Sequence, residues 1–228
     1  MLVKHLKPPV RPLKGGNTWA WDPNERWVRI YHRDDLLPSG DTQRAFGPRD
    51  RFDHHTPPPT APAIDPDGRK VLYAAKTLRT SGGEVFGDVG EATICPHYYA
   101  AAIRPARRII VQDVQGNGSM LIGALPALGS ADIDRVETQA WARAIYEDRP
   151  ASRDVTGVRY TGAHDEGPCV ALWETSPPLV VVEDLPLCDP GLFRRFATAM
   201  SELKIQSYVV ASSGCRRCRD ALGRGHPC

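Results

Sequence analysis

The segment 71–88, VLYAAKTLRTSGGEVFGD, carries the features on which the fold and the function of this chain depend. Its first five residues form an apolar run that predicts a buried strand. A polar turn is expected next, and Glu84 then stands directly before Val85 and Phe86. A carboxylate in apolar surroundings costs free energy unless it is paired, hydrogen-bonded or functional. The alternative is a Glu at the N-terminus of a helix, where it stabilises the helix dipole, and this segment alone favours it.

The composition is that of an ordinary globular protein. A chain of 228 residues, with 41% hydrophobic and 25% charged residues, can bury a core within one domain. A net charge of +2 without a clustered basic face predicts no direct contact with nucleic acid. The sequence contains no apolar run long enough for a signal peptide or a bilayer span, so we expect a cytoplasmic protein without membrane contact.

Three parts of the chain are expected from its proline, glycine and charge pattern. Residues 1–20 predict an extended N-terminal arm, and residues 21–213 predict a single domain. Residues 214–228 predict a flexible, basic C-terminal tail.

The tail also contains four candidate zinc ligands, which are Cys215, Cys218, His226 and Cys228. One Cys-x-x-Cys pair followed by a ligand at the final residue is a weak zinc signature. Six cysteines in a chain of this length are also too few for a disulfide framework. We therefore expect reduced thiols and no bound metal.

An upstream strand combines aromatic and basic side chains. Residues 27–33, WVRIYHR, alternate so that Arg29 and Tyr31 share one face with Trp27. Guanidinium groups bind phosphate oxygens and aromatic rings stack on a base, so this face suits a ligand that contains both. A solvent-facing strand with cation–π pairs is the alternative, and this segment alone favours it. Arg51 again stands beside an aromatic residue.

Strands outnumber helices in the remaining sequence. Strands are expected at residues 107–114, 157–161, 169–174 and 179–182, and helices at residues 132–147 and after Asp189. Because strands and helices do not alternate regularly, the pattern predicts an α+β fold and not a doubly wound sheet.

These segments, in this order, resemble the RES-domain family, which is named for an Arg, a Glu and a Ser. The matching pieces are Trp27-Val-Arg-Ile-Tyr31, Arg51-Phe-Asp-His-His-Thr-Pro-Pro, Val71-Leu-Tyr-Ala-Ala, Glu84-Val-Phe, Trp141-Ala-Arg-Ala-Ile-Tyr-Glu147, Gly157-Val-Arg-Tyr160 and Val170-Ala-Leu-Trp-Glu174. The resemblance implies a fold similar to ADP-ribosyltransferases, with a strand-rich core and flanking helices. Most members of the family are bacterial toxins that degrade NAD or transfer ADP-ribose, and their antitoxins are helical, Xre-like proteins.

The resemblance also implies roles for individual residues. Glu84 matches the Glu of the family and is expected to act on NAD as the substrate, together with Arg29, which matches its Arg. Arg29 and Arg51 are expected to hold the NAD phosphates, and Tyr31 and Tyr73 to shape the nicotinamide pocket. A carboxylate at this position stabilises the positive charge that develops on the ribose when the nicotinamide bond breaks.

The chain departs from the family at the Ser position. Gly162 aligns with that Ser to within one residue, between Thr161 and Ala163. Thr161 supplies a hydroxyl there only if the register shifts, and a shift of one residue in a strand reverses the direction of a side chain. We therefore expect Thr161 and Gly162 to line the NAD site, which is altered in its chemistry.

Several functions stay open at this point. The first is an NAD glycohydrolase, an NAD phosphorylase or an ADP-ribosyltransferase-like enzyme, and the retention of Arg29, Arg51 and Glu84 favours it. The second is a NAD or nucleotide binder without activity, which Gly162 favours. A protein-interaction module and a RES enzyme of a metabolic or biosynthetic pathway are further alternatives. The acceptor of the ADP-ribose group and self-association of the chain also stay open.

Overall fold

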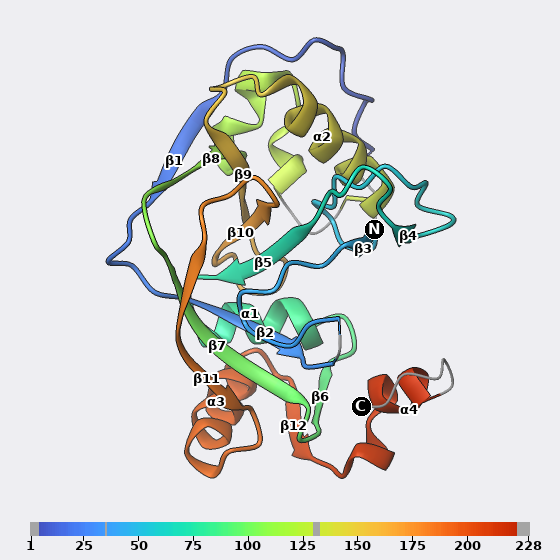
Figure 1. Cartoon of the computed structure of the whole chain (residues 1–228), viewed down its shortest axis with the longest axis vertical. Helices are drawn as coiled ribbons and strands as arrows, with labels where there is room; N and C mark the ends of the chain where they lie inside the picture. The colour runs from blue at the N-terminus through green and yellow to red at the C-terminus, as the bar shows by residue number, and fades with distance from the viewer. Residues whose placement is uncertain (1–4, 35, 130–132, 223–228) are drawn as a thin grey trace.

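The computed structural model describes residues 5–34, 36–129 and 133–222, and a large sheet lies at the centre of the molecule (Figure 1). Its strands are β1 (Asn17–Trp21), β2 (Trp27–His32), β5 (Val71–Ala75), β7 (Tyr98–Pro105), β8 (Ile109–Asp113), β9 (Val155–Thr161), β10 (Pro168–Trp173) and β11 (Leu179–Pro186). Their order in the sheet is β1-β8-β9-β10-β5-β2-β7-β11. The β8–β9 pair is parallel and the other neighbours are antiparallel.

Two small sheets and four α-helices accompany the central sheet. The small sheets pair β3 (Phe46–Gly47) with β4 (Ala63–Ile64), and β6 (Glu91–Ile94) with β12 (Gln206–Val209). The helices are α1 (Leu78–Phe86), α2 (Arg135–Asp148), α3 (Pro190–Glu202) and α4 (Arg216–Leu222). This arrangement confirms the prediction of an α+β fold with a strand-rich core and flanking helices. Among the described residues, no helix has the length and the apolar character that crossing a membrane requires.

Helix α1 occupies the segment for which the sequence predicts a polar turn, so that expectation is wrong. Thr77 caps the helix, and its side chain accepts a hydrogen bond from the Thr80 backbone N–H. Gly82 allows the helix to approach α3 closely, because an added Cβ would lie 2.4 Å from Met200 Cε. Two consecutive glycines lower helix propensity, and tertiary packing overrides this preference here.

The two faces of the central sheet are covered by different elements. One face packs against α2 through a cluster that contains Tyr160 and Trp173, and against α1 and α3 through a cluster that contains Ile30 and Phe196. The opposite face carries a third cluster, which includes Trp27 and Tyr31. Because side chains alternate along a strand, neighbouring residues of β2 lie on opposite faces.

The N-terminal segment is fixed to the domain along α2. Leu6 and Leu13 are buried, and the Leu13 backbone N–H donates to Asp148 Oδ2 at 2.8 Å. Arg11 pairs with Asp148 at 2.5 Å. The expected boundary at residue 20 falls inside β1, which pairs with β8 in the central sheet. A domain boundary at residue 20 is therefore wrong, because β1 belongs to the domain. The sequence of residues 17–21 does not show this, since pairing with a strand distant in the chain leaves no local pattern.

The C-terminal segment is also folded where the sequence predicts a flexible tail. Helix α4 begins at Arg216, and the side chains of Cys215 and Cys218 are buried. The expectation of a flexible segment from residue 214 is thus wrong for the described part, because buried contacts fix these cysteines. Two candidate zinc ligands of the tail, His226 and Cys228, lie outside the described residues.

Candidate functional site

Glu84 projects from α1 toward the end of β9 and is half-buried. Its Oε1 accepts a hydrogen bond from the Ala163 backbone N–H at 2.6 Å. Its Oε2 lies 3.6 Å from Arg51 Nη2 and 3.4 Å from the Tyr160 hydroxyl. Among the described residues, the second oxygen thus has long contacts only, so it has capacity for a further positive group.

Arg51 reaches this carboxylate from the loop between β3 and β4. Its Nη2 donates to the Thr161 backbone carbonyl at 3.1 Å. Its guanidinium carbon lies 5.1 Å from the centre of the Tyr160 ring and 5.8 Å from that of Phe52. These contacts hold a cationic group beside Glu84, where it is able to bind an anionic part of a ligand.

Asp53 fixes the loop that carries Arg51 and also orients Tyr73. Both oxygens of the fully buried Asp53 carboxylate accept from Arg44 Nη2, and Oδ1 accepts from the Tyr73 hydroxyl at 2.7 Å. Burial opposes the charge of Asp53, but the Arg44 guanidinium and the Tyr73 hydroxyl keep the pKa of this carboxyl below its usual value. The Tyr73 ring lies 6.4 Å from the Tyr160 ring, so the two tyrosines stand beside each other.

Two protonated side chains of β9 and β10 border the site. Burial, followed by the nearby Cys169 and Glu84, raises the pKa of Tyr160 well above its usual value. Burial and the Glu84 charge likewise raise the pKa of the Cys169 thiol. At neutral pH the Tyr160 phenol is therefore a neutral hydrogen-bond donor, and Cys169 is a thiol and not a nucleophilic thiolate.

Gly162 lies in a crowded part of the site. A Cβ at this position would be 3.1 Å from the Gly167 carbonyl oxygen, 3.1 Å from the Thr80 methyl group and 3.3 Å from Cys169 Sγ. The Thr161 hydroxyl accepts from Gln115 Nε2 at 3.2 Å, whereas its backbone carbonyl contacts Arg51. Thr161 thus does not bring its hydroxyl to Glu84.

The turn after β9 packs across α1 on the side of Glu84. Asp165 accepts from the Thr80 hydroxyl at 2.8 Å and pairs with Arg79 at 3.1 Å. These contacts position Gly162 and Ala163 over the helix. A surface hollow lined in part by Asp41 and Lys70 includes neither Glu84 nor Arg51.

Arg29 and Tyr31 do not join this arrangement. The backbone N–H of Ile30 donates to Ser81 of α1, and its side chain packs on the α1 face of the sheet. Arg29 and Tyr31 therefore lie on the opposite face, together with Trp27. The structure brings Glu84, Arg51, Tyr73, Thr161 and Gly162 together and separates Arg29 and Tyr31 from them.

The contacts of Arg29 and Tyr31 also differ from those of a phosphate-binding pair. Arg29 Nη1 donates to the backbone carbonyls of Gly40 and Thr42 at 2.9 Å and 2.6 Å. The Tyr31 hydroxyl donates to Asp184 at 2.8 Å. Burial lowers the pKa of Arg29 to about 10, so it remains charged at neutral pH. Arg29 thus fixes a loop over the far face of the sheet.

Three residues of the site are missing from the sequence-based prediction, namely Asp53, Tyr160 and Cys169. Tyr160 could have been identified from the sequence. Residues two apart in a strand share a face, so Val158 and Tyr160 lie together on the buried face of a predicted strand. The sequence gives no such indication for Asp53 or Cys169. Asp53 depends on contacts with Arg44 and Tyr73, and Cys169 depends on the nearby Glu84, and these partners are distant along the chain.

Comparison with known proteins identifies the family and the fold of the chain. The RES domain matches residues 26–190, which are most of the chain. The chain therefore belongs to the RES-domain family, as its motifs predict. A chain of the crystal structure of the M. tuberculosis MbcT–MbcA toxin–antitoxin complex is similar in structure, with a TM-score of 0.50 and 21% identity. The alignment covers 80% of this chain and 91% of that one, and at this identity it shows a shared fold. No curated protein gives a significant match.

Proposed function

We propose that this chain is an NAD-consuming enzyme that cleaves the bond between nicotinamide and ribose. The observation that supports the proposal is the position of the Glu84 carboxylate, 3.6 Å from the Arg51 guanidinium and in contact with the Tyr160 hydroxyl. A carboxylate, a phosphate-binding cation and two aromatic rings are the groups that binding and cleavage of NAD require. Membership of the RES-domain family supports the same reaction.

In the proposed reaction, the C1′–N bond breaks and its electron pair leaves with nicotinamide, which becomes a neutral pyridine. Positive charge develops on the ribose ring, and the Glu84 carboxylate stabilises this charge more strongly in the transition state than in the bound substrate. Water, phosphate or a protein side chain then supplies the electron pair of the new bond at C1′. These acceptors correspond to a hydrolase, a phosphorylase and a transferase.

The other residues of the site have binding roles in this proposal. Arg51 holds a phosphate of NAD, and Tyr73 and Tyr160 stack beside the nicotinamide ring. The Ala163 backbone N–H fixes one Glu84 oxygen and leaves the other directed at the ribose. No step of the reaction requires Arg29, because it lies on the other face of the sheet.

A toxin-type role with a protein inhibitor fits this activity. A toxin that depletes NAD must be held inactive in the cell that makes it, and we propose a small, helical, Xre-like antitoxin as its partner. The support for this partner is the family and the similarity in fold to a chain of a toxin–antitoxin complex.

Binding of NAD without cleavage is the second candidate function, and Gly162 favours it. Gly162 aligns with the Ser of the family to within one residue, and here Thr80 and Cys169 crowd the space that a side chain at Gly162 would take. The binding groups Arg51 and Tyr73 are present in either case. A RES enzyme of a metabolic or biosynthetic pathway is a further alternative, and it would use the same site.

The experiment that separates these functions is incubation of the purified chain with NAD, in the presence and absence of phosphate. Free nicotinamide, together with ADP-ribose or its 1-phosphate identified by mass, supports an enzyme and names the acceptor. Growth arrest and a fall of cellular NAD on expression support the toxin role. If NAD binds by calorimetry but is not consumed under either condition, nor after a cell lysate is added as a source of protein acceptors, the enzyme proposal is wrong and the binder is correct.

A further inference from the structure

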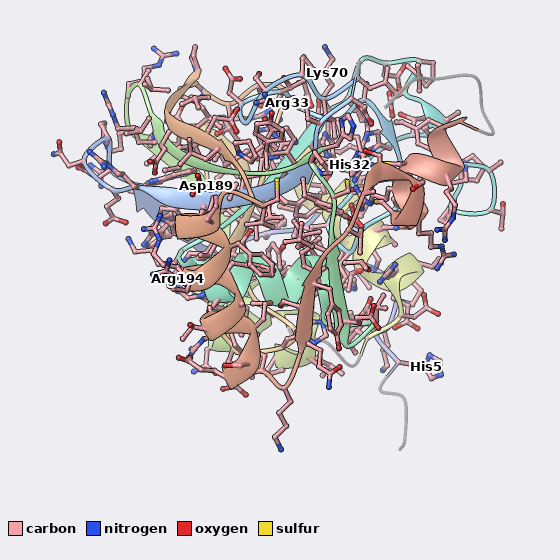
Figure 2. The ribbon with its side chains drawn as sticks, turned by 90° about the horizontal axis from the view of Figure 1, so that it is seen from below. His5, His32, Arg33, Lys70, Asp189 and Arg194 are labelled. Carbon is pink, nitrogen blue, oxygen red and sulfur yellow. The ribbon has the colours of Figure 1, made fainter. Side chains whose placement is uncertain are left out.

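Four potential metal ligands meet at one point near the end of β2, away from the Glu84 site. They are His32, Cys95, Cys215 and Cys218, and their Nε2 and Sγ atoms all lie within 4.8 Å of one another. His32 ends β2, Cys95 directly follows β6, and the other two cysteines lie at the start of α4 and inside it. Figure 2 labels His32 where the C-terminal segment crosses the end of β2.

Four of the six distances between these atoms are close to the edges of a tetrahedron around one metal ion. Zinc bonds of about 2.3 Å to sulfur and about 2.0 Å to nitrogen require S···S edges of about 3.8 Å and S···N edges of about 3.5 Å. The Sγ atoms of Cys95 and Cys218 are 3.6 Å apart. His32 Nε2 lies 3.5 Å from Cys95 Sγ, 3.3 Å from Cys218 Sγ and 4.0 Å from Cys215 Sγ.

Ordinary core packing is a poor account of these side chains. Buried cysteines often serve as small apolar residues, but a histidine at the same point is polar and requires a partner. The sulfur separation of 3.6 Å also excludes a disulfide between Cys95 and Cys218 in this structure. All four side chains are at least 97% buried, so water does not satisfy the imidazole.

Helix α4 gives a second, independent observation. From Arg216 to Arg219, only the Cys218 side chain is buried, and the three arginines are exposed. A helix of seven residues is marginal without tertiary packing, and here no apolar stripe supplies that packing between Arg216 and Arg219. Among the described side chains, Cys215 and Cys218 are thus the buried contacts that hold the start of this helix against the domain.

We propose that His32, Cys95, Cys215 and Cys218 bind one zinc ion as a structural site. Four protein ligands close the coordination shell, which is typical of structural zinc and leaves no position for a substrate or for water. Three thiolates and a neutral imidazole favour zinc over the hard cations magnesium and calcium, which prefer oxygen ligands.

The surroundings are suited to the charge of such a centre. Zinc with three thiolates carries a net charge of −1, and Arg216, Arg217 and Arg219 flank it on α4. Cationic neighbours favour the deprotonated ligands that zinc binding requires.

The site joins the RES domain to a segment beyond it. His32 and Cys95 lie within the matched residues 26–190, whereas Cys215 and Cys218 lie after them. The zinc ion thus ties the C-terminal segment to the end of β2 and to the connection between β6 and β7. This ligand set shares Cys215 and Cys218 with the four candidates of the tail, but it replaces His226 and Cys228 with two residues distant in sequence.

Metal analysis of the full chain, purified under reducing conditions, tests the proposal. We expect roughly one zinc ion per chain, and a loss of most of it in H32A, C95S, C215S and C218S. Cys188→Ser is the matched control, because Cys188 is a free, partly buried cysteine outside the cluster, and it should retain the zinc. His226→Ala and Cys228→Ser should also retain it.

A second measurement separates loss of a ligand from loss of the fold. Cobalt exchanged into the site should give the visible absorption of tetrahedral thiolate coordination, and the sulfur-to-cobalt band should weaken in C95S while Cys188→Ser leaves it unchanged. Removal of zinc from the wild-type chain by a chelator should lower the melting temperature by about 5 °C or more, and zinc but not magnesium should restore it.

Three results would overturn the proposal. The first is a chain that contains no zinc and binds none on reconstitution in the reduced state. The second is zinc that persists in H32A and C95S but is lost in His226→Ala and Cys228→Ser, which would assign the ion to the tail alone. The third is a melting temperature that neither chelation nor added zinc changes.

Discussion

Arg51 Nη2 lies 3.6 Å from Glu84 Oε2, although Arg51 comes from the loop between β3 and β4 and Glu84 from α1. Asp53 and the Thr161 backbone carbonyl hold the loop and the guanidinium in this position. The pair places opposite charges beside Tyr160, so one group is suited to the phosphates of NAD and the other to the cationic ribose. The predictions below separate these two roles.

Glu84→Gln is expected to lower NAD turnover by about a hundredfold or more. The substitution keeps the shape of the side chain and removes the charge that stabilises the transition state. The measurement is nicotinamide release at saturating NAD, with the melting temperature as a check of the fold. The exposed Glu91 gives the matched control, since Glu91→Gln should retain turnover. Turnover equal to that of wild type in Glu84→Gln would exclude this carboxylate from the reaction.

Arg51→Ala and Arg29→Ala are expected to act on different properties. Arg51→Ala should weaken NAD binding by roughly tenfold to hundredfold, because it removes charged hydrogen bonds to a phosphate. Arg29→Ala should instead reduce the free energy of unfolding by about 1–3 kcal/mol, because it leaves the carbonyls of Gly40 and Thr42 without their donor. Calorimetry with NAD and chemical denaturation measure the two effects. Weaker NAD binding in Arg29→Ala at unchanged stability would contradict the assignment.

Gly162→Ser is expected to combine a steric cost with a gain in hydrogen bonding. The new Cβ has three neighbours at 3.1–3.3 Å, so the substitution should cost about 1 kcal/mol or more of stability. Gly162→Ala carries the same crowding without the hydroxyl and is the matched control. If the hydroxyl contacts NAD, Ser should exceed Ala in turnover by roughly threefold to tenfold. Equal turnover of the two variants would show that the hydroxyl has no role.

Thr161→Val is expected to change NAD turnover by less than about twofold. The Thr161 hydroxyl pairs with Gln115, and only the backbone carbonyl of Thr161 contacts Arg51. The same nicotinamide assay measures this effect. A large loss of turnover with unchanged stability would show that Thr161 has taken the place of the missing Ser.

Glu174 is expected to make stability depend on pH in the acid range. Burial opposes its charge, but hydrogen bonds from His54 and Tyr146 lower its pKa to about 2. A group whose pKa is lowered on folding stabilises the protein above its unfolded value of about 4.5 and loses this effect as pH falls toward 2. The contribution at neutral pH is about 3 kcal/mol.

Chemical denaturation of wild type and Glu174→Gln at several pH values measures this contribution. The difference in unfolding free energy should be large at pH 7 and should shrink between pH ~4.5 and ~2. Glu91→Gln, at an exposed position, should give a small difference that does not change with pH. A difference for Glu174→Gln that stays constant down to pH ~2 would contradict the expected pKa.

Much of the fold was predictable because it rests on local patterns. Alternation in residues 27–32 and the apolar run of residues 71–75 identify β2 and β5, and helical spacing identifies α2 and α3. Helix α1 was not predictable in this way, because Ser81, Gly82 and Gly83 disfavour a helix in isolation. Its packing on α3 supplies the free energy that the local sequence lacks.

The sequence by itself determined the family motifs, the α+β class and the place of Glu84 within the segment 71–88. Only the tertiary structure decided that Arg51, and not Arg29, lies beside Glu84. Alternation along β2 assigns Arg29 to one face of the strand, but it does not tell which part of the chain covers that face. The tertiary structure likewise decided that His32 and Cys95 meet Cys215 and Cys218. The physical reason is that a local pattern reports on neighbours within one element, whereas a site depends on which distant elements pack together.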